Sequence, residues 1–316
     1  MSTGSARIPN FFIVGKPKAG TTALHRMLEQ HPEIFMSAYK EPHHFHREYI
    51  ATAEQRNRGH LTQPYREREA YLRLFEAAGA EKVIGESSTG YLYSKTSADE
   101  IAEFNPNAKI LMVLREPFDF IHSYHSQLLR SANENEADFR KALLLEESRK
   151  RGERIPFTAT DPSNLFYTEQ AKYCEQVERY FRAFNRSQIK IVFYEDFKTD
   201  NRAVFREILQ FLEVDPDFTP ELDDINPTRR VRFPRLTSWL VYFADKRNPG
   251  LTARIPGWLL TPLRAMMRKI FYTRGERAQL DPQLKRELQL GFKPEVVKLS
   301  KLLDVDLVEK WGYDRI

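Results

Sequence analysis

The apolar residues of this chain fall into short runs that alternate with segments of helical periodicity. Uninterrupted apolar runs occupy residues 11–14 and 110–114, and each has the length of one buried strand. Residues 83–84 and 189–194 form weaker runs of the same kind. After the first run, apolar side chains recur at spacings of three and four over residues 21–28, which predicts an amphipathic helix.

Strands that alternate with helices in this way predict an α/β fold. We expect a single domain over residues 1–316, in which a mostly parallel sheet is flanked by helices on both faces. Three further segments carry other patterns. Residues 47–66 are polar and predict a surface loop, and residues 164–185 predict one long helix. Residues 236–275 are amphipathic and partly basic, which favours a helix of the core or of an acceptor groove over a helix on a membrane surface.

The composition narrows the class of ligand. Apolar residues make up 41% of the 316 residues, enough for a substantial core, and 29% are charged. Lysine and arginine number 49 against 44 aspartates and glutamates, so the net charge is +5. This balance suits an anionic ligand, but it is too weak to indicate a nucleic acid.

The cysteine count and the hydropathy bear on the compartment. Cys174 is the one cysteine, which excludes an intrachain disulfide and a cysteine-rich zinc site and is typical of a reducing compartment. The N-terminus lacks the apolar stretch of a signal peptide. No apolar run approaches the roughly 18 residues that a membrane helix needs. We therefore expect a cytoplasmic protein without an integral membrane segment.

A glycine-bounded loop over residues 15–20 joins the first predicted strand to the first predicted helix. This arrangement turns backbone N–H groups toward an anion, and two lysines in the loop add positive charge. A nucleotide loop of the Walker type has lysine directly after its second glycine, whereas this chain has Thr21 there and carries Lys18 inside the loop. We interpret the loop as a phosphate cradle of a P-loop fold, but not as a standard ATP loop. The alternative is an ordinary strand–helix turn with solvated lysines.

A second candidate anion site follows the strand over residues 110–114. Arg115 ends this strand, and Pro117 is a helix-start signal directly after it. A guanidinium in this place suits a phosphate monoester, and Ser123 lies two turns along the helix. A structural ion pair of Arg115 is the alternative.

A third candidate site is the segment over residues 40–46. Pro42 disfavours helix at Glu41, so this carboxylate lies on an irregular segment that can fold over the mouth of the glycine loop. It could accept a proton from a substrate hydroxyl, with His43 as the second candidate base. On the residues alone, a surface salt bridge with Lys40 is the favoured interpretation.

A group of arginines and a group of histidines are weaker signals of a site. The loop over residues 226–235 holds four arginines, which could close over an anion, contact an acidic acceptor or form a surface patch. Five histidines gather in residues 43–46 and 122–125, but no cysteine or carboxylate pattern supports a metal site.

Three motifs of this chain resemble the sulfotransferases that use 3′-phosphoadenosine 5′-phosphosulfate (PAPS). Residues 17–22 resemble their 5′-phosphosulfate loop, residues 114–124 resemble their 3′-phosphate motif, and residues 40–45 are similar to a stretch of the heparan-sulfate branch. The resemblance implies that Glu41 is the general base and that Lys18 contacts the leaving phosphate. The donor-binding residues that we predict are Lys18, Ala19, Gly20, Thr21, Thr22, Arg115, Ser123, Arg230 and Arg232.

The predicted reaction is sulfuryl transfer from PAPS to an acceptor hydroxyl or amine. The resemblance leaves the acceptor open among carbohydrates, lipids and small molecules, and it leaves the oligomeric state open. Ser87 stands where the branch has a second lysine. We expect no metal, because a sulfuryl group carries less charge than a terminal phosphoryl group. The alternatives are a P-loop kinase and a non-catalytic module that binds nucleotides or polyanions.

Overall fold

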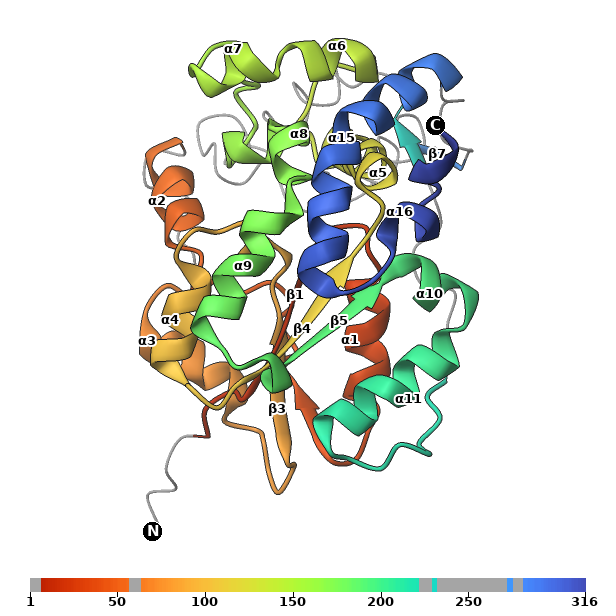
Figure 1. Ribbon diagram of the computed structural model, residues 1–316. Coiled ribbons are helices and arrows are strands. Elements are labelled where there is room, and N and C mark those ends of the chain that lie inside the picture. The colour runs from red at the N-terminus through yellow and green to blue at the C-terminus, as the bar shows by residue number, and fades with distance from the viewer. Residues whose placement is uncertain (1–6, 57–63, 222–228, 232–271, 275–280) are drawn as a thin grey trace.

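The computed structural model describes residues 7–56, 64–221, 229–231, 272–274 and 281–316. Its centre is a five-stranded sheet in the order β2-β3-β1-β4-β5, with all neighbouring strands parallel (Figure 1). The strands are β1 (Phe11–Gly15), β2 (Ile34–Met36), β3 (Val83–Ser87), β4 (Lys109–Leu114) and β5 (Ile189–Phe193). The predicted parallel sheet is therefore confirmed.

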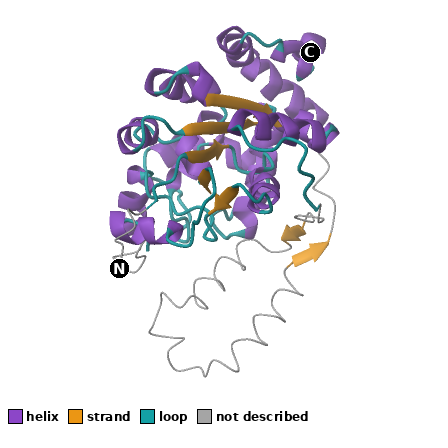
Figure 2. Cartoon of the chain, turned by 90° about the horizontal axis from the view of Figure 1, so that it is seen from below, coloured by secondary structure: helices purple, strands orange, loops and turns teal. Residues whose placement is uncertain are grey.

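Helices cover both faces of this sheet, as Figure 2 shows. Alternate residues of a strand point to opposite faces, so Phe12 and Val14 pack with one group of helices, and Phe11 and Ile13 with the other. The first group is α4 (Ser97–Phe104), α5 (Pro117–Arg130), α9 (Tyr173–Ala183) and α15 (Pro282–Leu303). The second group is α1 (Thr21–Glu29), α10 (Tyr194–Thr199) and α11 (Asn201–Leu212). This two-sided burial explains why the central strands read as unbroken apolar runs.

Short elements complete the described part of the chain. They are α2 (Arg47–Arg56), α3 (Arg68–Leu72), η1 (Arg73–Phe75), η2 (Thr89–Leu92), α6 (Phe139–Leu144), α7 (Glu146–Lys150), η3 (Pro162–Leu165), α8 (Tyr167–Gln170), η4 (Arg186–Gln188), α16 (Leu307–Lys310) and η5 (Tyr313–Arg315). Strands β6 (Arg229–Val231) and β7 (Tyr272–Arg274) form a separate antiparallel pair. Among the described residues, no helix combines the length and the apolar character needed to cross a membrane.

Two predictions about secondary structure were wrong. Residues 47–56 form helix α2 instead of a loop, because Ile50 and Ala53 share a buried face. The long helix predicted over residues 164–185 is broken into η3, α8 and α9. At the break, Gln176 Nε2 donates to the backbone oxygens of Gln170 and Lys172. In a continuous helix, backbone N–H groups would donate to these oxygens instead. The helix predicted within residues 236–275 falls almost entirely outside the described residues.

The carboxyl ends of the parallel strands meet at one edge of the sheet. The glycine loop follows β1, the residues from Ser88 follow β3, Arg115 follows β4 and Tyr194 follows β5. Ligands of open α/β sheets bind outside this edge, where connections leave the strands on opposite faces. The candidate site therefore lies at this edge.

Candidate active site

The glycine loop leads into helix α1 in a conformation that suits an anion. Lys18 and Gly20 have φ angles of 66° and 89°, both in the left-handed region. Gly20 is the N-cap residue of α1, and its carbonyl accepts from the N–H groups of Ala23 and Leu24. The first N–H groups of a helix have no partners inside the helix, so those of Thr21 and Thr22 are available to an anion. The predicted strand, loop and helix start are confirmed.

Arg115 lies directly against this loop. Its Nη1 donates to the backbone oxygen of Lys18 at 2.9 Å, and its guanidinium lies 4.4 Å from the centre of the Tyr194 ring. The side chain is buried, and its Nε has no hydrogen-bond partner within the described part of the chain. A buried donor without a partner fits an anionic ligand at this position.

Helix α5 begins directly after Arg115. Glu116 is the N-cap residue, and its Oε2 accepts from the N–H of Asp119 at 2.6 Å, while Pro117 occupies the first turn. Ser123 lies two turns further along this helix and is buried. Arg115, directly after β4, and Ser123, on α5, are the two residues of the predicted 3′-phosphate site, and one continuous segment carries both.

Glu41 lies on the irregular segment that the sequence predicted. Its backbone N–H donates to the oxygen of Ser87 at 2.9 Å, which fixes the segment to the end of β3. Its Oε1 lies 2.8 Å from Lys40 Nζ, and its Oε2 lies 3.7 Å from His43 Nε2. The salt bridge that the residues alone favoured is therefore present, and the carboxylate remains 38% exposed.

The surroundings of Glu41 favour its ionised form. Burial acts to raise the pKa of this carboxyl, but the charge of Lys40, the neighbouring His43 and hydrogen bonds outweigh it, so the pKa lies below the ordinary value. Burial lowers the pKa of His43 despite the opposing charge of Glu41. At neutral pH the pair is therefore an ionised carboxylate beside a neutral imidazole.

Backbone strain accompanies this arrangement. Glu41 and His43 have φ angles of 63° and 55°, an uncommon conformation for residues with side chains. Such strain persists only where surrounding contacts fix the backbone. Two hydrogen bonds fix the backbone of this segment: Ser88 Oγ accepts from the N–H of His43 at 3.4 Å, and Tyr91 Oη accepts from the N–H of Phe45 at 3.3 Å.

Glu86 anchors both of these hydroxyls, a role that sequence reasoning missed. Its carboxylate is fully buried and accepts from Ser88 Oγ at 2.7 Å, from Tyr91 Oη at 2.8 Å and from Tyr71 Oη at 3.0 Å. Burial raises its pKa from 4.5 to about 7, although the hydroxyl bonds act in the opposite direction. The available signal was an acidic residue within a buried strand, where a carboxylate needs partners.

Ser87, which stands where the heparan-sulfate branch has a second lysine, pairs with His25. Ser87 Oγ lies 2.8 Å from His25 Nδ1, and both side chains are buried. Burial, together with the nearby charges of Lys40 and Arg26, lowers the pKa of His25 to about 4, so this imidazole is neutral. Nothing in the local pattern indicates that His25, on helix α1, lies against Ser87.

The predicted contribution of the basic loop falls largely outside the described residues. Arg232 is not among them, and Arg230 is described only as part of the backbone of β6. The structure thus brings together Lys18, Arg115 and the residues of the glycine loop.

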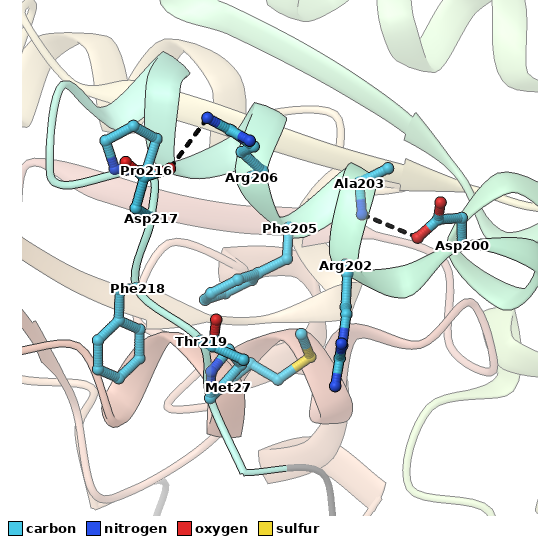
Figure 3. A pocket seen from close by; sticks show the side chains of 11 residues that line it. Met27, Asp200, Arg202, Ala203, Phe205, Arg206, Pro216, Asp217, Phe218 and Thr219 are labelled. Carbon is cyan, nitrogen blue, oxygen red and sulfur yellow. Dashed lines mark hydrogen bonds and ion pairs between the residues drawn. The ribbon is translucent and has the colours of Figure 1, made fainter.

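A groove of about 430 Å³ lies elsewhere on the molecule, between α1 and α11 (Figure 3). Met27, Phe205 and Phe218 contribute to its lining, and Arg206 pairs with Asp217 at 2.9 Å on its wall. None of the sequence-predicted site residues lines this groove. It is therefore separate from the candidate active site.

Comparison with known proteins identifies the family of this chain. Residues 9–220 match the family model described as "Sulfotransferase family". The chain therefore belongs to the sulfotransferase family. A crystal structure of a sulfotransferase from Alicyclobacillus acidocaldarius is 28% identical, with a TM-score of 0.69 over 96% of this chain and 98% of that one.

Curated relatives share only part of their length with this chain. Carbohydrate sulfotransferase 15 of Rattus norvegicus is 26% identical over an alignment 254 residues long, and the match covers 66% of this chain and 44% of the relative. Bifunctional heparan sulfate N-deacetylase/N-sulfotransferase 3 of Homo sapiens is 25% identical over an alignment 219 residues long, and the match covers 67% of this chain and 23% of the relative. The chain thus matches less than half the length of these relatives.

Proposed function

We propose that this chain transfers a sulfuryl group from PAPS to a hydroxyl or amine of an acceptor. The observation that carries the proposal is the 2.9 Å bond from Arg115 Nη1 to the backbone oxygen of Lys18. This bond joins the two segments to which we assign the phosphates of the donor, distant in sequence, at the carboxyl edge of the sheet. PAPS carries two phosphate groups, at the 5′ and 3′ positions of one adenosine, and needs two such sites.

Each segment has its own part in binding the donor. The N–H groups of Gly20, Thr21 and Thr22 hold the 5′-phosphate at the start of α1. Arg115 and Ser123 hold the 3′-phosphate and so select this donor over nucleotides without that group. The buried Nε of Arg115, which has no partner within the described residues, supports this assignment. Arg230 and Arg232 stay predicted donor contacts.

The chemical step is a displacement at sulfur. The acceptor oxygen or nitrogen forms a bond to sulfur, the bond from sulfur to the bridging oxygen breaks, and adenosine 3′,5′-bisphosphate leaves. Lys18 neutralises the charge that grows on the bridging oxygen, and positioning and electrostatics supply most of the acceleration. The acceptor's proton passes to the Glu41 carboxylate.

The electrostatics of Glu41 agree with this role. A general base must be unprotonated before the reaction, and the Lys40 ammonium at 2.8 Å keeps the carboxylate ionised at neutral pH. The same pairing lowers the basicity of the carboxylate, so its proximity to the acceptor has to compensate. His43, which is neutral at this pH, is the second candidate for the base.

The relatives guide the choice of acceptor. Their names refer to carbohydrates and to heparan sulfate, so we propose carbohydrate hydroxyls and amines as the first acceptors to test, followed by lipid and small-molecule hydroxyls. We also propose that the whole chain, residues 1–316, acts as one catalytic domain.

The test is transfer of ³⁵S from labelled PAPS to a panel of these acceptors. Glu41→Gln should abolish turnover while adenosine 3′,5′-bisphosphate still binds, because the amide cannot take the proton. Glu67→Gln is the matched control, since the Glu67 side chain is 81% exposed and lies outside the site. Full turnover in Glu41→Gln would remove Glu41 from the mechanism, and absence of transfer to every acceptor would contradict the proposed function.

A further inference from the structure

Lys16 is a buried lysine inside the glycine loop, and the proposed mechanism does not use it. Only 1% of this residue is exposed. Nζ donates to Gln170 Oε1 at 3.3 Å. It also lies 5.4, 5.5 and 5.6 Å from the ring centres of Tyr93, Phe120 and Tyr173. Gln170, Tyr93, Phe120 and Tyr173 form the Lys16 cage.

Stability alone does not favour a lysine at this position. Removing an ammonium from water is costly, and one hydrogen bond with three ring faces compensates only in part. Burial, followed by repulsion from Arg179, holds the pKa of Lys16 well below its ordinary value. Methionine has nearly the same length, packs well against aromatic rings and carries no charge to bury. A role in function would account for the lysine.

The Lys16 cage joins the glycine loop to the segment that carries Arg115. Tyr173 Oη donates to the backbone oxygen of Arg115 at 3.0 Å. Phe120 lies on α5, one turn before Ser123. The backbone N–H of Lys16 donates to the oxygen of Val113 at 2.9 Å, two residues before Arg115. The side chain of Lys16, in the loop assigned to the 5′-phosphate, thus packs against α5 and α9. These two helices contact or carry the residues assigned to the 3′-phosphate.

We propose that Lys16 is a positioning residue that holds the two anion sites at the spacing of a single doubly phosphorylated nucleotide. A change at Lys16, in the loop of the 5′-phosphate, then weakens recognition of the 3′-phosphate as well. The inference rests on the proposed function, because it concerns how the same donor site is assembled. Lys16 acts through Tyr173 and Arg115, not through contact with the reacting atoms.

The experiment compares two nucleotides that differ only in the 3′-phosphate. Dissociation constants of adenosine 5′-monophosphate and adenosine 3′,5′-bisphosphate are measured by calorimetry. The constant of the monophosphate divided by that of the bisphosphate is the ratio that reports the contribution of the 3′-phosphate. Lys16→Met and Tyr173→Phe should each lower this ratio about fivefold or more, the scale of an ordinary coupling between sites. The melting temperature of Lys16→Met should equal or exceed that of the wild type, because the change removes a buried cation.

Two controls separate positioning from general damage. Lys172→Met makes the same substitution at a lysine whose side chain is 58% exposed. Tyr180→Phe removes another buried hydroxyl of α9, which donates to the backbone oxygen of Tyr91 at 3.0 Å and does not reach Arg115. Both controls should keep the wild-type ratio.

The outcomes distinguish the inference from the proposed function. A wild-type chain that binds both nucleotides equally, or neither, would overturn the proposed function and the inference together. If the wild type binds the bisphosphate more tightly, but Tyr173→Phe or folded Lys16→Met has the same ratio as the wild type, the inference alone is overturned. Should Lys16→Met fail to fold, Tyr173→Phe decides, since it keeps the ring and removes only the hydroxyl.

Discussion

Glu86 gives the sharpest prediction about the stability of the site. Its buried carboxylate has a pKa of about 7 in the folded chain, against an ordinary value of 4.5. As the pH rises from 4.5 to 7, the unfolded chain therefore loses this proton before the folded chain does. The folded state is favoured below this window, and that advantage is lost as the pH rises through it.

The magnitude follows from the difference between the two pKa values. Each pKa unit corresponds to about 1.4 kcal/mol, so Glu86 should remove roughly 3 kcal/mol from the free energy of unfolding once it is fully ionised. Most of this loss, about 2.5 kcal/mol, should fall between pH 5 and pH 8. Glu86→Gln keeps the shape of the side chain and cannot titrate, so this part of the pH dependence should vanish.

Urea unfolding of the wild type and of Glu86→Gln at pH 5 and pH 8 measures the effect. From pH 5 to pH 8, the free energy of unfolding of the wild type should fall by about 2.5 kcal/mol more than that of the variant. Glu81→Gln, at a charged residue near the other end of β3, is the control and should retain the wild-type pH dependence. Parallel pH profiles for the wild type and Glu86→Gln would refute the assignment of a raised pKa to this carboxyl.

Three further predictions concern the donor site and the core. Lys18→Ala should lower turnover at saturating donor by at least about 100-fold, the scale of one transition-state contact, in the ³⁵S assay; a loss below tenfold would contradict the role of Lys18. Arg115→Ala should weaken binding of adenosine 3′,5′-bisphosphate in calorimetry but leave that of adenosine 5′-monophosphate unchanged, and an unchanged bisphosphate affinity would remove the 3′-phosphate assignment. Arg149 and Glu134 form a fully buried pair at 2.7 Å, so Arg149→Met should cost about 3–5 kcal/mol in urea unfolding; a loss under 1 kcal/mol would show that the stranded carboxylate finds other partners.

Features set by neighbouring residues could be predicted from the sequence. The central strands β1 and β4 are buried on both sides, so their apolar runs are nearly unbroken and easily recognised. The glycine loop depends on local backbone geometry, which Gly20 and the following helix signal directly. The placement of Arg115 at the edge of the sheet follows from the end of its strand and from Pro117.

Features that depend on distant contacts could not be predicted. The partner of Lys16 is Gln170, 154 positions away, and nothing in the local pattern indicates that the lysine turns inward. The hydroxyl of Tyr71, on α3, donates to Glu86 of β3 at 3.0 Å, a contact between two elements that neither local pattern indicates. The break before α9 arises because the side chain of Gln176 satisfies backbone oxygens, which helical periodicity does not reveal.

The two-phosphate donor site can be seen in a crystal structure of the chain soaked with adenosine 3′,5′-bisphosphate. We expect one nucleotide with its 5′-phosphate on the N–H groups of Gly20 to Thr22 and its 3′-phosphate on Arg115 and Ser123. A nucleotide bound elsewhere, or in this place with the 3′-phosphate away from Arg115, would contradict this expectation.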